Sequence, residues 1–194
     1  MNPLTSLLSF FKTKPSVATE GNKKWRRGYN AFEAGKKHYA EQRTEEALDC
    51  FDTAVECGFE DGTLFGLRGS CLQTLEWDLD AIDDFSAAIS FEPQDCNNYY
   101  ARAMSKQGAG DPQGALADIQ EAIRLSRVDN ALNRHYDSGA KEMGWPSTAA
   151  RYEVDELRLA SFFNGEMAGF MRDALIARNI ERTKLKGRRK NKLQ

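Results

Sequence analysis

Hydrophobic and small residues recur along the chain at a fixed interval of about 34 residues, as from Ala47 to Ala81. Four columns repeat in phase: Ala47, Ala81 and Ala115; Phe51, Phe85 and Ile119; Ala54, Ala88 and Ala122; and Val55, Ile89 and Ile123. A period of about 34 residues with two helices in each unit is typical of an array of helical hairpins. A single hairpin would leave an apolar face uncovered, so neighbouring units are expected to stack.

Helix starts and stops divide the periodic region into three hairpins. Gly58 and Pro93 are expected to end the second helices of the first two units, because proline cannot continue a helix and glycine is a common stop. Asp111 before Pro112 predicts a helix start, since aspartate caps free amides and proline fits the first turn. The six expected helices pair as about 24–41 with 44–57, 63–75 with 79–91, and 97–107 with 112–125.

A small residue stands near the middle of each expected first helix, at Gly35, Gly69 and Ala103. With the alanine and aromatic columns, this pattern resembles the tetratricopeptide repeat family over about residues 28–127. The closing proline of that family is present only in the middle unit, as Pro93. The resemblance implies an all-α, right-handed α-solenoid of helix-turn-helix hairpins with capping helices. It also implies a binding scaffold rather than an enzyme.

The pattern weakens after the third unit. Gly144 and Pro146 keep the period, but Glu153 and Glu156 occupy the aromatic and alanine columns. Residues 128–163 are therefore expected to form a degenerate fourth repeat or a capping hairpin, because terminal units of such arrays are atypical. The apolar side chains expected to face the array are Leu157, Leu159, Phe162 and Phe163. The other expected segments are an amphipathic leader and linker at 1–22, three repeats at 24–127, a C-terminal helix at 164–186 and a basic disordered tail at 187–194.

Composition narrows the class of protein. The 194 residues are 41% hydrophobic, which is enough for one substantial or elongated core. No apolar run approaches the length of a membrane span, and the first residues lack the basic start and cleavage site of a secretory signal, so we expect a cytoplasmic protein. The four cysteines, which form no CxxC pair, are expected to be buried free thiols: Cys50, Cys57, Cys71 and Cys96.

The net charge of −2 hides a strong segregation along the chain. Residues 41–95 hold fifteen acidic and two basic side chains, whereas residues 1–40 hold eight basic and two acidic ones. Residues 172–194 hold nine basic and two acidic side chains. Such asymmetry can steer partners or allow self-association between copies, although a run of charge is more often a solvated face.

The sequence offers few candidate catalytic residues. His38 and His135 have no companion at metal-ligand spacing. Gly108 and Gly110 fall in a turn between helices rather than in a phosphate-binding loop. Paired carboxylates such as Asp83 with Asp84 are expected on exposed helix faces. The sequence therefore predicts no catalytic residues, metal or cofactor.

A binding groove is the better candidate site. In tetratricopeptide arrays the first helices line a concave surface, and the resemblance assigns thirteen positions to it: Tyr29, Phe32, Lys36, Tyr39, Ser70, Gln73, Thr74, Asn97, Tyr100, Met104, Gln107, Arg134 and Lys141. Aromatic rings and adaptable amides suit the capture of an extended or helical segment of another protein. The alternative is that Tyr29, Phe32 and Met104 pack against the leader or the terminal helix.

One subclass of ligand is excluded by the residues. Family members that grip the acidic tails of chaperones share a clamp of lysine, asparagine and arginine side chains. The corresponding places here are Phe32 and Lys36, Leu67, Asn97 and Ala101, so the clamp is absent. A partner other than a chaperone tail is expected.

Two other kinds of contact remain open. Leu4, Leu7, Leu8, Phe10 and Phe11 form an apolar stripe beside basic residues, which suits peripheral attachment to an anionic membrane. A basic cluster near the C-terminus could contact nucleic acid through phosphates, but it lacks interleaved aromatic residues. That cluster is Lys184, Lys186, Arg188, Arg189, Lys190 and Lys192.

Overall fold

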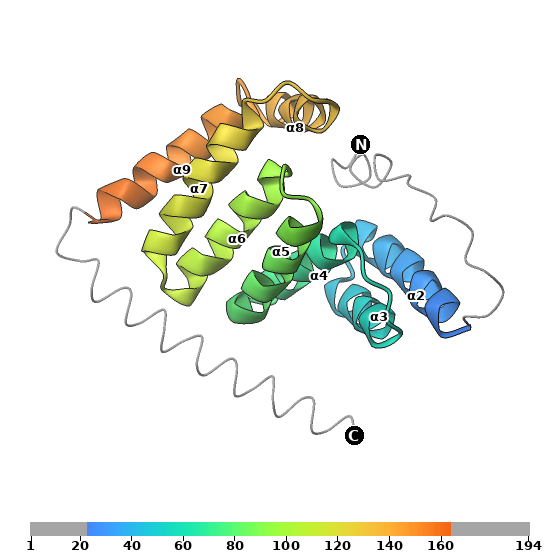
Figure 1. Cartoon of the computed structure of the whole chain (residues 1–194). Helices are drawn as coiled ribbons and strands as arrows, with labels where there is room; N and C mark the ends of the chain where they lie inside the picture. The colour runs from blue at the N-terminus through green and yellow to red at the C-terminus, as the bar shows by residue number, and fades with distance from the viewer. Residues whose placement is uncertain (1–22, 164–194) are drawn as a thin grey trace.

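The computed structural model describes residues 23–163, and every regular element in that range is a helix. The helices are α2 (Lys23–Ala40), α3 (Thr44–Glu56), α4 (Gly62–Thr74), α5 (Asp78–Phe91), α6 (Cys96–Ala109), α7 (Pro112–Ser126), α8 (Ala131–Glu142) and α9 (Thr148–Phe163). Within each of the pairs α2–α3, α4–α5 and α6–α7 the two helices pack together, and the pairs stack in chain order (Figure 1). The expected all-α array of helical hairpins is confirmed. No helix within residues 23–163 is long and apolar enough to cross a membrane.

The first helices of the second and third hairpins start at aspartates placed by the repeat. Asp61 Oδ1 accepts hydrogen bonds from the amides of Thr63 at 2.9 Å and Leu64 at 3.3 Å. Asp95, one period later, accepts the amide of Asn97 at 2.9 Å. These caps satisfy amides that have no partner inside the helix, so they fix where α4 and α6 begin.

The turn inside each hairpin also repeats in its backbone. Gln42 and Glu76 both have φ of 59°, and Gly110 and Gly144 have φ of 83° and 86°. These four positions follow one another at the period of the repeat and lie in the left-handed region, where glycine has the least strain. The period therefore extends to the turn between α8 and α9.

Small residues let the helices of each hairpin approach closely. The alanines of the repeated columns are 0% exposed, and so is Phe51. A Cβ added to Gly35 would lie 2.5 Å from the Phe51 ring, and one added to Gly69 would lie 3.0 Å from the Phe85 ring. In the third unit, where the ring is replaced by Ile119, the small residue is an alanine. The two columns are thus matched in size across the hairpin.

The fourth unit departs from this packing. The position of the small residue is occupied by Asp137, whose carboxylate accepts the amide of Thr148 at 2.8 Å. α9 packs mainly on α7, while α8 points in another direction and touches α9 little (Figure 1). Leu159 is 3% exposed, as expected of a residue facing the array, but the expectation for Leu157 is wrong, because it is 70% exposed.

Several expected segments lie outside the described residues. They are the leader and linker at 1–22, the C-terminal helix at 164–186 and the tail at 187–194. The side chains of Phe162 and Phe163 are likewise outside the description.

Candidate binding surface

The first helices α2, α4 and α6 lie side by side, because α4 contacts both of the others. Most residues expected in the groove lie on these three helices. Thr74 and Gln107 are exposed, and the half-buried ones are Tyr29, Lys36, Tyr39, Ser70, Gln73, Asn97 and Met104. We call the surface formed by Lys36, Tyr39, Ser70, Gln73, Thr74, Asn97, Met104 and Gln107 the first-helix face.

Two aromatic residues expected in the groove, Phe32 and Tyr100, are in the core instead. Phe32 is 6% exposed and stacks on Phe59, with ring centroids 5.2 Å apart. Tyr100 is 8% exposed and stacks on Tyr152 of α9 at 4.1 Å. Tyr29 also packs, 5.8 Å from the Phe59 ring. These aromatic side chains therefore hold the helices together.

The hydroxyl of Tyr100 completes that contact. It donates a hydrogen bond of 2.6 Å to Asp155 Oδ2 on α9. Burial and this hydrogen bond raise the pKa of Tyr100 to about 12, so the hydroxyl stays protonated at neutral pH. α9 is thereby fixed to α6 as well as to α7.

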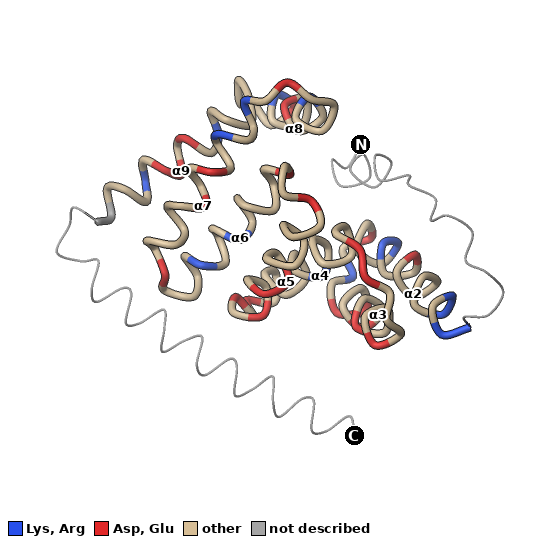
Figure 2. The backbone as a smooth tube through the Cα atoms, in the orientation of Figure 1, with Lys and Arg blue, Asp and Glu red and all other residues tan. Residues whose placement is uncertain are grey.

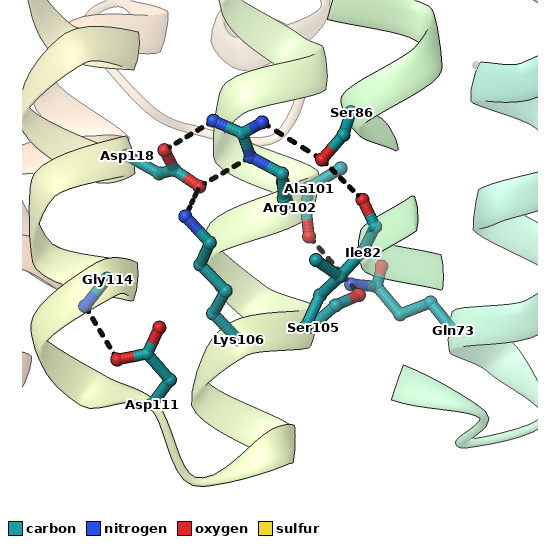
Figure 3. A network of polar contacts seen from close by, with 10 residues as sticks. All are labelled: Gln73, Ile82, Ser86, Ala101, Arg102, Ser105, Lys106, Asp111, Gly114 and Asp118. Carbon is teal, nitrogen blue, oxygen red and sulfur yellow. Dashed lines mark hydrogen bonds and ion pairs between the residues drawn. The ribbon is translucent and has the colours of Figure 1, made fainter. Parts of the chain in front are cut away.

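A glutamine fixes α4 against α6 within the first-helix face. Gln73 Nε2 donates to the carbonyl oxygen of Ala101 at 2.9 Å and to Ser105 Oγ at 2.8 Å (Figure 3). Ser105 is 0% exposed, so this bond joins the face to the interior. The spacing between the two helices is set by direct side-chain contact, which favours a rigid surface.

A periodic pair of arginines connects successive hairpins. Arg68 Nε and Nη2 donate to Asp84 at 2.7 and 2.6 Å, and its Nη1 lies 3.2 Å from Asp52. The expectation that Asp84 lies on an exposed face is wrong, because this paired carboxylate belongs to a residue that is 4% exposed. Arg68 thus joins α4 to its own partner helix α5 and to the preceding hairpin through α3.

The same arrangement recurs one period later (Figure 3). Arg102 donates two hydrogen bonds of 2.8 Å to Asp118 and one of 3.1 Å to Ser86. Lys106 adds a second cation 2.8 Å from Asp118. The sequence signal for these pairs was an arginine and an aspartate, each recurring at the period of the repeat, which the apolar columns did not include.

Charge is distributed unevenly over the array. Acidic residues concentrate on the second helices α3 and α5 (Figure 2). On the first-helix face, Lys36 Nζ lies 4.7 Å from the centre of the Phe32 ring and 2.7 Å from Glu33. The first-helix face is therefore mixed in character, with hydroxyls, amides and one lysine.

The remaining two expected groove residues lie on α8. Arg134 and Lys141 are both exposed, and Arg134 pairs with Asp129. α8 is attached to the start of α6 by polar bonds, including one of 3.0 Å from the Tyr136 hydroxyl to Asp95, the residue that caps α6.

A pocket of about 140 Å³ lies between the start of α6, α8 and the start of α9. Asn97 of the first-helix face lines it together with Met143, Thr148 and Arg151. This pocket was not expected from the sequence, because it depends on the separation of α8 from α9.

Reactive groups are few in the described part of the chain. Within residues 23–163, no three His, Cys, Asp or Glu side chains gather where they could hold a metal ion. The four cysteines are free, but Cys50 and Cys57 are half-buried rather than buried. Burial raises the pKa of both Cys71 and Cys96 to about 12, which keeps these thiols protonated.

The residues expected to contact a membrane or a polyanion lie outside the described chain. They are Leu4, Leu7, Leu8, Phe10 and Phe11 for the membrane, and Lys184, Lys186, Arg188, Arg189, Lys190 and Lys192 for the polyanion.

The sequence matches no protein-family model and no curated protein. The fold is nevertheless shared with solved structures. A T3SS complex from Aeromonas hydrophila has a TM-score of 0.61 at 17% identity, covering 84% of this chain and 99% of that one. PcrH in complex with the chaperone binding region of PopD has a TM-score of 0.57 at 17% identity, with coverage of 69% and 90%. The tetratricopeptide repeat domain of Arabidopsis OM64 has a TM-score of 0.50 at 17% identity, with coverage of 57% and 91%.

Proposed function

Because the described helices have the fold of a tetratricopeptide array, we propose that this protein is a non-enzymatic adaptor that binds a segment of another protein on its first-helix face. The observation that carries the proposal is the arrangement of that face. Its partly exposed hydroxyl, amide and thioether groups stand on helices that are held together by buried rings and by Gln73. A preorganised surface of this kind loses little entropy when a peptide binds.

Two features support a protein segment as the ligand. The face spans three neighbouring first helices, so an extended or helical segment could cross them. Its groups include both donors and acceptors, which suit a peptide backbone. PcrH, whose fold is similar, is seen in complex with a region of another protein.

The test adds bulk and charge to the face without touching the core. We would compare wild type with a Thr74→Arg/Gln107→Arg variant, because both residues are exposed on first helices. The matched control is Ser90→Arg/Ala117→Arg, which adds the same charge at exposed positions of the second helices α5 and α7. Each protein would be used to recover partners from the native cell extract after its helicity has been checked.

The proposal expects a protein that is retained by wild type and by the control but lost with the first-helix variant. Retention by all three would place the binding surface elsewhere. Loss with both variants would indicate an effect of charge alone.

A further inference from the structure

Thr148 lines the pocket between α6, α8 and α9 and carries a buried hydroxyl that makes no hydrogen bond within the described residues. Thr148 is 4% exposed, and its Oγ1 has no hydrogen-bond partner within the described chain. The backbone amide of the same residue is already occupied by Asp137. Burial of an unpaired hydroxyl lowers stability, so the folded state gains nothing from this group.

Arg151 lines the same pocket and is held in place by two aromatic rings. The Arg151 guanidinium carbon lies 5.0 Å from the centre of the Tyr100 ring and 6.0 Å from that of Tyr152. Within residues 23–163, Arg151 makes no ion pair with a carboxylate, whereas Arg158 on the same helix pairs with Asp155 at 3.0 Å. The rings orient the guanidinium, so a ligand would meet a preformed donor.

The size of the pocket suits one side chain. A cavity of about 150 Å³ is known to hold a benzene ring, and this pocket of about 140 Å³ has room for a short acidic group. Its lining combines apolar side chains, among them Ala140, Met143 and Tyr152, with polar ones. A carboxylate with a short apolar stem matches that combination.

We propose that this pocket binds a carboxylate carried by the partner segment, with Arg151 as its cation and the Thr148 hydroxyl as an added donor. The planar guanidinium presents two parallel N–H groups, which fit the two oxygens of a carboxylate. Asn97 belongs both to the pocket and to the first-helix face, so a segment on that face can reach it. The inference rests on the proposed function, because it names the chemistry of the same partner.

Within residues 23–163, the neighbouring acidic side chains do not fill this role. Asp155 accepts the Tyr100 hydroxyl and pairs with Arg158. Asp137 accepts the Thr148 amide and is engaged there. Glu142 also lines the pocket but is exposed, so solvent and salt screen its charge. Arg151 is the cation nearest to the unused hydroxyl in sequence, three residues further along the first turn of α9.

The test uses three short peptides titrated into the full chain and followed by NMR. N-acetyl-Ala-Glu-Ala-amide carries only a side-chain carboxylate, N-acetyl-Ala-Ala-Ala carries only a terminal one, and N-acetyl-Ala-Gln-Ala-amide carries none. We expect one of the first two to bind with a Kd on the order of 1 mM and to shift the Arg151 Nε–H signal. The one that binds identifies the source of the carboxylate. Equal binding of the glutamine peptide, or no binding by any peptide, would overturn the proposal.

Variants then locate the binding. Arg151→Gln should weaken the carboxylate peptide about tenfold or more, while the control Arg158→Gln on the same helix should not. Thr148→Val removes the hydroxyl at nearly constant shape, so it should leave the urea midpoint unchanged or raised while it weakens binding. Unchanged binding in Arg151→Gln or in Thr148→Val contradicts the assignment of that group. The peptide titrations do not depend on the recovery of partners through the first-helix face. A negative result for the pocket can therefore be told apart from a negative result for the adaptor function.

Discussion

The periodic arginine pairs allow one residue to be tested against its own repeat. In Arg68→Met, the carboxylate of Asp84 would lose the guanidinium that donates two hydrogen bonds to it, at 2.7 and 2.6 Å. The Asp84 side chain is 6% exposed, so water cannot replace the lost charge. Breaking a buried ion pair by removing one partner costs about 3–5 kcal/mol. We expect a loss of that size in the free energy of unfolding.

The equivalent change one period later, Arg102→Met, should lower the free energy of unfolding less than Arg68→Met does. In Arg102→Met, Lys106 remains 2.8 Å from Asp118 and continues to balance its charge. The position one period before Lys106 is Leu72, which offers Asp84 no such help. A hydrogen bond to a charged group contributes about 1.5–3 kcal/mol, so we expect Arg102→Met to lower the free energy of unfolding by about that amount.

The assay is equilibrium unfolding in urea, followed by far-UV circular dichroism at neutral pH. The double variant Arg68→Met/Asp84→Leu should recover much of the stability lost in Arg68→Met, because no buried charge remains. Equal losses in Arg68→Met and Arg102→Met, or a double variant as unstable as Arg68→Met, would refute this account of the pairs.

Three further predictions concern packing and pH. Gly35→Ala should lower the melting temperature more than Gly69→Ala, because the added Cβ would lie 2.5 Å rather than 3.0 Å from an aromatic ring; calorimetry of the two variants checks the order. Phe32→Ala should cost about 3–5 kcal/mol in urea unfolding, since the side chain is in the core, and a normal midpoint would contradict its burial. Burial alone would raise the pKa of Asp118, but Arg102 and Lys106 outweigh it and hold that pKa below the ordinary 3.8. The stability from this carboxylate is therefore present above pH 3.8 and is lost as the pH falls through the lower folded pKa. Lys106→Met should reduce the stability that is lost on acidification, as measured by urea unfolding at a series of acidic pH values.

The sequence was sufficient to predict the helical pairs. Alanine and aromatic columns in phase with each other predicted the hairpins, and the observed α7, Pro112–Ser126, begins at the proline that was expected to start it. These columns are informative because a close helix contact tolerates only small residues facing a ring. The structure adds that the two columns change together. Gly69 faces Phe85 in the second unit, and one period later the larger Ala103 goes with the smaller Ile119.

The site was harder to predict, because it depends on contacts between distant segments. Tyr100 was expected in a groove, but Tyr152 of α9, far along the chain, covers it. That contact exists because α9 packs on α7. Asp137, which stands where earlier units have a small residue, was visible in the sequence, but the direction of the helix that follows depends on contacts across the array.

The polar attachment of α8 has a consequence for local motion. α8 buries only Asn133 and Ala140 among its own residues. It is held through Asn133 Nδ2, which donates to the carbonyls of Leu125 and Val128 at 2.7 Å each. Tyr136 also packs on the core, but α8 buries fewer side chains than α6 or α7. Its amides should therefore exchange with solvent before those of α6 and α7. A ligand between α8 and α9 would bind the closed form and slow this exchange in proportion to its concentration. Order in α8 would then report occupancy of the pocket.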